Sequence, residues 1–163
     1  MHRFALVLSL ALPACDFAAP ARSTAPADSA AGEVKFELEG PNEAAFVVPV
    51  HINGHGPVNF VLDTGATLSC IDVSLARELK LPDEGPMGGV AIGAMSAGAI
   101  ETVRMDTLRV GNASAFDIVA CRLDLAALRS ALGVQGLIGL NFLKQFDVRI
   151  DFDRRVVSLT KTE

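Results

Sequence analysis

Apolar and polar side chains alternate with a period of two along most of the chain after residue 45, which predicts strands with one buried face. In the first such run, residues 46–53, one face of an extended chain carries only apolar side chains: Phe46, Val48, Val50 and Ile52. The Asn53-Gly54 dipeptide that follows is typical of a two-residue hairpin turn. Further strands are predicted at 58–62, 69–73, 102–110, 115–123, 148–152 and 156–160.

Short helices are predicted between some of these strands. Ser74 can cap a helix over 75–79, which Pro82 prevents from continuing. Asp124 can cap a second helix that Gly133 ends, and a third is expected over 142–146. Because the helices are short and the strands cover most of the folded part, the pattern predicts an all-β domain.

The segment from Gly85 to Gly98 breaks the alternation, because it is rich in glycine, alanine and methionine. Glycines weaken regular packing and permit bending. Two interpretations remain open: a flexible hairpin that closes over a cleft, or a loose surface loop.

The N-terminus has the features of an export signal. His2 and Arg3 precede the apolar run 4–12, and Leu12-Pro13-Ala14-Cys15 resembles the bacterial lipobox, in which the cysteine is lipidated. Residues 16–32 are mostly Ala, Pro, Ser and Asp, which predicts a flexible tether before a folded domain at 33–163. We therefore expect an exported protein, lipid-anchored through Cys15 in the bacterial cell envelope or periplasm. Secretion without lipid and a cytoplasmic protein with an apolar N-terminus are the alternatives.

Length and charge exclude several classes of function. A chain of 163 residues fits one domain, and a net charge of −5 without a basic run argues against a nucleic-acid partner. No apolar stretch reaches the ~18–20 residues that a membrane-spanning helix needs. Three histidines, at positions 2, 51 and 55, lack companion ligands, and no phosphate-binding loop is present, so neither a metal nor another cofactor is expected.

The strongest chemical signal is the segment 60–66, Phe-Val-Leu-Asp-Thr-Gly-Ala. A carboxylate at the end of an apolar strand is costly unless it is hydrogen-bonded or shares a proton. With Ser69-Cys70-Ile71 after it, this segment resembles the active-site loop of the retropepsin-like (clan AA) aspartic proteases, in their single-domain bacterial type. An ordinary turn between two core strands is the competing interpretation.

A second motif, Gly136-Leu137-Ile138-Gly139-Leu140-Asn141, strengthens the resemblance. Gly139 follows Asp63 by 76 residues, a spacing typical of the family. The resemblance, which covers residues 45–160, implies that Leu137, Ile138 and Gly139 pack behind the active-site loop. It also implies a closed barrel or sandwich with one or two short helices and a glycine-rich flap hairpin. Substrate contacts would come from Ala66 and from three flap glycines: Gly88, Gly89 and Gly93.

The resemblance implies an aspartic endopeptidase with Asp63 as catalytic residue, assisted by Thr64 and Gly65. Such an enzyme needs one ionised and one protonated carboxylate at the same bond. This chain contains one Asp-Thr-Gly, so the second carboxylate is expected from the Asp63 of a second subunit, in a homodimer. The remaining aspartates of the domain are predicted to be solvated turn or surface charges, among them Asp72, Asp106, Asp117, Asp147 and Asp151.

Two questions stay open at this level. Because fold does not fix function, a non-catalytic peptide-binding or scaffolding envelope lipoprotein on the same fold is the alternative to a protease. With Cys15 committed to lipid in an exported protein, Cys70 and Cys121 remain. In folds of this family their strands pack close together, so a disulfide is expected, with two buried thiols as the alternative.

Overall fold

The structure, a computed structural model, describes residues 32–88, 90–92, 95–97 and 99–162. The expected signal segment, Cys15 and nearly all of the expected tether lie outside the described residues. Within them, strands predominate, and the prediction of an all-β domain is confirmed. No helix in this part of the chain combines the length and apolar character that crossing a bilayer requires.

The main sheet closes on itself into a barrel. Its strand order is β2-β3-β4-β11-β5-β10-β9-β6, and β3 pairs with β9 as well as with β4, which joins the two halves. The bounds are β2 (Glu37–Glu39), β3 (Ala45–Ile52), β4 (His55–Leu62), β5 (Cys70–Asp72), β6 (Asp83–Met87), β9 (Ile100–Val110), β10 (Ala113–Leu123) and β11 (Gly136–Ile138).

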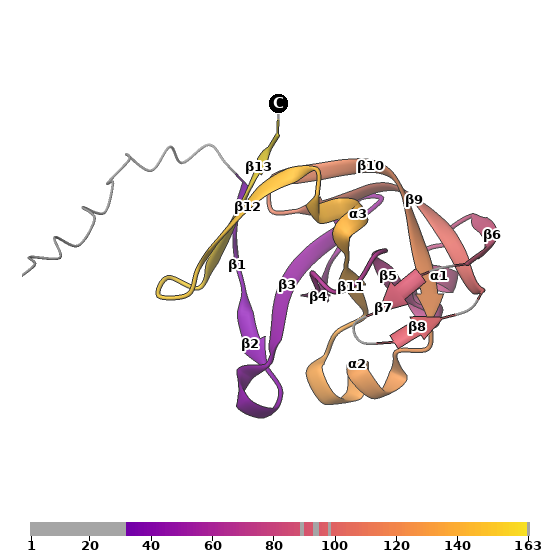
Figure 1. Cartoon of the computed structure of the whole chain (residues 1–163), viewed down its shortest axis with the longest axis horizontal. Coiled ribbons are helices and arrows are strands. Elements are labelled where there is room, and N and C mark those ends of the chain that lie inside the picture. The colour runs from indigo at the N-terminus through magenta and orange to yellow at the C-terminus, as the bar shows by residue number, and fades with distance from the viewer. Residues whose placement is uncertain (1–31, 89, 93–94, 98, 163) are drawn as a thin grey trace, which may run out of the picture.

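Two smaller sheets flank this barrel (Figure 1). The first has the order β1-β13-β12, formed by β1 (Gly32–Lys35), β13 (Val156–Lys161) and β12 (Phe146–Asp151), so β12 is an edge strand. The second is an antiparallel pair of β7 (Val90–Ile92) and β8 (Met95–Ala97). This pair lies within the glycine-rich segment, which therefore contains a hairpin rather than only a loose loop.

Three short α-helices occur in the described residues, where the resemblance implied one or two: α1 (Val73–Glu78), α2 (Ala126–Leu132) and α3 (Leu140–Leu143), besides the 3-10 turn η1 (Pro41–Glu43). The cap of α1 differs from the prediction. Asp72, not Ser74, is the N-cap, because the Asp72 carboxylate accepts a hydrogen bond from the Ser74 amide at 2.9 Å. Gly133 ends α2 in a left-handed conformation, as the sequence predicted.

The period-two pattern places the core where the sequence indicated. Val48, Val50 and Ile52 of β3 are fully buried inside the barrel, together with Phe60 of β4. The turn between these strands has positive φ at both central positions, Asn53 and Gly54, which is the geometry that a two-residue hairpin requires. Asp63 follows directly after β4, so the rigid barrel wall positions the candidate catalytic residue.

Candidate active site

Asp63 begins a tight loop that is tied to the barrel by its backbone. Its amide donates a hydrogen bond to the carbonyl oxygen of Ile138 at 2.9 Å. The Gly65 amide donates to Oδ1 of Asp63 at 2.8 Å, so the loop orients its own carboxylate. Asp63 is half-buried, Thr64 and Gly65 are exposed, and Ala66 is fully buried. The loop therefore presents Asp63, Thr64 and Gly65 toward solvent while Ala66 anchors it in the interior.

The second motif lies against this loop, as the resemblance implied. β11 is inserted between β4 and β5, parallel to the first and antiparallel to the second. A Cβ atom on Gly139 would clash with the backbone of Leu68 and Ser69, so only glycine permits this close approach. Beyond it, the Leu140 amide donates to the carbonyl oxygen of Ala66 at 2.8 Å. Segments far apart in the sequence thus form one hydrogen-bonded unit beneath Asp63.

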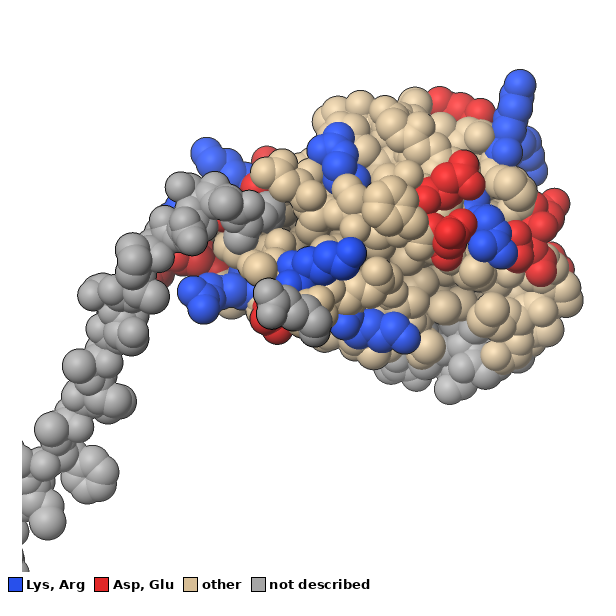
Figure 2. All heavy atoms as spheres, turned by 90° about the horizontal axis from the view of Figure 1, so that it is seen from above, with Lys and Arg blue, Asp and Glu red and all other residues tan. Residues whose placement is uncertain are grey.

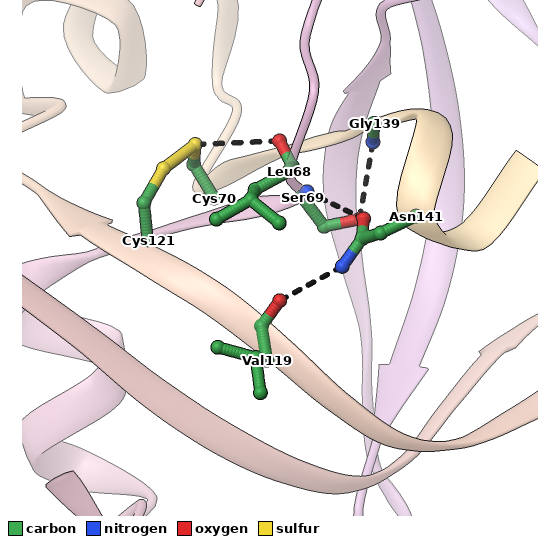
Figure 3. The surroundings of a disulfide bond; sticks show 7 residues. All are labelled: Leu68, Ser69, Cys70, Val119, Cys121, Gly139 and Asn141. Carbon is green, nitrogen blue, oxygen red and sulfur yellow. Dashed lines mark hydrogen bonds between the residues drawn. A yellow bond between two sulfur atoms is a disulfide. The ribbon is translucent and has the colours of Figure 1, made fainter. Parts of the chain in front are cut away.

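A side-chain pair that the sequence did not reveal completes this unit (Figure 3). Oδ1 of Asn141 accepts hydrogen bonds from the amide of Ser69 at 2.7 Å and from its hydroxyl at 3.0 Å. The Ser69 Oγ in turn accepts from the Gly139 amide at 3.1 Å, and Asn141 Nδ2 donates to the Val119 carbonyl at 2.8 Å. Ser69 belongs to the segment after the Asp-Thr-Gly sequence and Asn141 to the second motif, but no pattern in the sequence indicates that their side chains meet.

Comparison with known proteins identifies the family. A family described as "Aspartyl protease" matches residues 48–142, which is more than half of the chain and contains both motifs. The chain belongs to the aspartyl protease family.

A solved structure shows the same fold. The chain is similar to a retropepsin-like aspartic protease from Rickettsia conorii, with a TM-score of 0.52 and 19% identity over 78% of this chain and 89% of that chain. It is also similar to the retroviral protease-like domain of Ddi1 from Leishmania major, with a TM-score of 0.45 and 18% identity over 73% of this chain and 94% of that one. A search of curated proteins finds no match.

In this aspartyl protease family member, Cys70 and Cys121 form a disulfide bond. They are direct neighbours on the parallel strands β5 and β10, with 4.4 Å between their Cα atoms, and both are fully buried. The bond forms the centre of a small apolar cluster with Ile100 and Leu137. It therefore links the strand that leaves the Asp63 loop to a long strand of the barrel.

Asp72, which the sequence analysis treated as a surface charge, is instead a buried structural residue, with 3% of its side chain exposed. Its Oδ1 accepts from the Ser74 amide and from Arg129 Nη1 at 2.8 Å, and its Oδ2 accepts from the Leu125 amide at 3.0 Å. Burial raises the pKa of Asp72, but hydrogen bonds from Ser74 and Leu125 and the charge on Arg129 outweigh it and hold the pKa below its usual value.

No described contact joins Asp63 to the predicted flap glycines or to the remaining aspartates. Gly88 is exposed at the end of β6, and Gly89 and Gly93 lie outside the described residues. Asp106, Asp117 and Asp147 are exposed. In the described parts of the chain, no group of three or more His, Cys, Asp and Glu residues is placed to hold a metal ion.

Proposed function

We propose that this protein is an aspartic endopeptidase, with a catalytic dyad formed by the Asp63 residues of two identical subunits. The observation that carries the proposal is the conformation of the Asp63 loop. Among the described residues, the Gly65 amide is the one donor bonded to the Asp63 carboxylate, and it binds Oδ1. Oδ2 therefore stays available for a water molecule or a second carboxyl group. Membership of the aspartyl protease family supports the same reading.

A second subunit is required because one carboxylate cannot be ionised and protonated at once. Asp72, the buried aspartate at the end of β5, cannot supply the second carboxylate, because its oxygens already accept hydrogen bonds from Ser74, Leu125 and Arg129. The exposed position of Thr64 and Gly65 leaves the loop free to meet its copy across a two-fold axis. There the Thr64 hydroxyl would bond to the other loop and hold the two carboxylates in register.

Exposed apolar side chains on the described domain support a homodimer. β12 is an edge strand whose backbone can pair with another strand, and Val148 and Ile150 on it are 39% and 38% exposed. Leu140, which follows Gly139 and bonds to the active-site loop, is 42% exposed. Pairing of β12 with its copy would cover part of the surface of Val148 and Ile150, and a contact at Leu140 would lie next to the active-site loop.

The proposed chemistry needs no metal and no covalent intermediate. The ionised Asp63 removes a proton from water, and the water oxygen attacks the peptide carbonyl carbon. The protonated Asp63 of the partner subunit donates its proton to the carbonyl oxygen and so stabilises the tetrahedral intermediate. Asp63 then gives the proton that it took from water to the amide nitrogen, and the now ionised Asp63 of the partner subunit removes a proton from a hydroxyl group of the intermediate. The C–N bond breaks, and a carboxylic acid and an amine are released. The β7–β8 hairpin would close over the peptide, whereas Ala66, which the resemblance implied as a substrate contact, is fully buried beneath the loop and supports it from inside.

The decisive test is Asp63→Asn, which keeps the shape and removes the ionisable group. We expect cleavage of an unfolded protein at acidic pH to fall by about 10²–10⁴-fold, the usual contribution of acid–base catalysis. Asp106→Asn, at an exposed position on β9, is the matched control and should cleave at the wild-type rate. Equal rates for wild type and Asp63→Asn would end the enzyme proposal and favour a peptide-binding lipoprotein.

Two further experiments test the dimer: dilution of the protein, and substitution of an exposed apolar residue by lysine. Specific activity should fall as the protein is diluted below the dimer dissociation constant. Ile150→Lys should shift sedimentation toward monomer and lower activity together. Phe116→Lys, at a 65% exposed apolar residue on β10, serves as the control. A fully active monomer in sedimentation would contradict the shared dyad.

We also propose that the protein is exported and lipid-anchored through Cys15, with the residues before β1, which begins at Gly32, as its tether. The Cys70–Cys121 disulfide supports export, because disulfides persist in oxidising compartments. Cys15→Ser should move the protein from the membrane fraction to the soluble fraction of the cell envelope. Equal membrane association of the variant would rule out the anchor. Two free thiols in unreduced, denatured protein would remove the support from the disulfide.

A further inference from the structure

A pocket of about 390 Å³ lies outside the loop of Asp63, between α1, the start of β6 and the end of β10. Its lining consists of three cationic residues, one acidic residue and three apolar residues: Arg77, Lys80, Arg122, Asp83, Val73, Ala76 and Leu81. On the face drawn in Figure 2, Lys and Arg side chains are spread out or lie among Asp and Glu. The pocket itself is lined by three cationic side chains and one carboxylate.

Only one of these three charges is neutralised in the described residues. Arg122 Nη1 lies 2.6 Å from Oδ1 of Asp83, and Nη2 lies 4.0 Å from Oε2 of Glu101. Among the ion pairs of the described chain, none involves Arg77 or Lys80. The residues that line the pocket thus have two positive charges in excess, and Glu101, which lies outside the lining beside Arg122, lowers this excess to one.

The backbone at Lys80 provides a second, independent observation. Lys80 follows the end of α1 in the left-handed region, with φ of 51°. The Lys80 amide donates to the Arg77 carbonyl and the Leu81 amide to the Ala76 carbonyl, each at 3.1 Å. This is the helix ending in which glycine is normally found, because a side chain disfavours the left-handed conformation. Lys80 shares this left-handed conformation with five other non-glycine residues of the described chain, and its side chain is one of the groups that line the pocket.

We propose that this pocket binds a compact soluble oxyanion of the phosphate class, a site separate from the proposed peptidase centre. Arginine forks and a lysine ammonium are the groups that bind phosphate oxygens with charge-assisted hydrogen bonds. Arg122, fixed by Asp83, orients the anion, and Arg77 and Lys80 neutralise it. The carboxylate of Glu101, which lies outside the lining beside Arg122, disfavours an extended anionic surface such as a membrane, which favours a small ligand.

The test is a calorimetric titration of the full-length protein with pyrophosphate at constant ionic strength. Wild type should bind saturably. Lys80→Gly should bind at least about tenfold more weakly, the loss expected for one charge-assisted hydrogen bond. Because glycine suits the left-handed position, this variant should unfold at a temperature equal to or above that of wild type. Arg77→Gln should also weaken binding.

Lys161→Gln, at an exposed lysine near the end of β13, is the control for simple loss of charge and should bind like wild type. Absence of saturable binding to wild type would overturn the proposal. Equal affinities for wild type, Lys80→Gly and Arg77→Gln would overturn it as well. Neither result depends on peptidase activity, so the site and the proposed protease can fail separately.

Discussion

Asp63 and Asp72 are nine residues apart in the sequence, but their side chains have opposite environments. Asp63 is half-buried and accepts one hydrogen bond in the described structure, from Gly65. Asp72 is buried and is bonded to Ser74, Leu125 and Arg129. The carboxylate with unused acceptor capacity can take part in chemistry, whereas the one with its oxygens satisfied can only hold the structure together.

The comparison also bears on pH. A proposed dyad that shares a proton works in an acidic range, where ordinary carboxylates of the scaffold begin to lose their charge. Hydrogen bonds and Arg129 hold the pKa of Asp72 below its usual value, against the effect of burial. The residue that fastens α1 and α2 to the barrel therefore keeps its charge to a lower pH than an unperturbed aspartate would.

Removal of the Asp72 carboxylate should have the largest effect on stability. We expect Asp72→Ala to lower the free energy of unfolding by about 2–4 kcal/mol, because it removes the cap of α1 and leaves the Leu125 amide without its partner. Asp63→Ala should lower the free energy of unfolding by about 1 kcal/mol or less, because the loop that begins at Asp63 is exposed to solvent at Thr64 and Gly65. Urea denaturation of both variants measures the difference. Equal losses would mean that Asp63 is also a structural residue.

Gly139→Ala should act on the support of Asp63 rather than on the carboxylate. The added methyl group meets the backbone of Leu68 and Ser69, which cannot move without shifting the loop. We expect a loss of about 1–3 kcal/mol of stability, the usual cost of overpacking. Gly88→Ala, at an open position where nothing lies within 4 Å, is the matched control. Thermal unfolding that does not distinguish the two variants would contradict the close approach.

Arg129→Gln should have a smaller effect than Asp72→Ala. The Arg129 side chain is 41% exposed, so solvent screens its interaction with Asp72, and we expect a cost of about 1 kcal/mol or less. The Asp72 carboxylate keeps its bonds to Ser74 and Leu125 in this variant. Chemical denaturation provides the measurement, and a loss as large as that of Asp72→Ala would show that the ion pair, not the amide donors, stabilises this junction.

The lowered pKa of Asp72 should make the free energy of unfolding fall as the pH is lowered. A carboxyl group whose pKa is lower in the folded state stabilises the fold above its unfolded pKa of about 3.9. That stabilisation is lost as the pH falls through the lower folded-state value. Wild type should therefore lose stability as the pH falls below about 4, more steeply than Asp72→Asn, which has no group to titrate. Identical pH profiles in denaturation experiments would show that the folded-state pKa is not lowered.

The sequence by itself determined the features that local chemistry encodes. The alternation along 46–52 predicts a strand with one buried face, and the glycine after Asn53 predicts the turn that follows it. The Asp-Thr-Gly after an apolar strand, together with the glycine at 139, was sufficient to indicate the family. Each of these signals is contained in a few neighbouring residues, so no knowledge of distant contacts was needed.

The tertiary structure alone decided which residues meet. Asp72 was misjudged because its partners Leu125 and Arg129 lie 53 and 57 residues away, beyond the reach of any local pattern. The pairing of Ser69 with Asn141 and the cationic pocket between α1 and β10 likewise depend on the order and register of strands. A side chain's burial and pKa follow from such contacts, and closure of the barrel creates them. The same residue type can therefore serve as a candidate catalyst after β4 and as a structural residue at the end of β5.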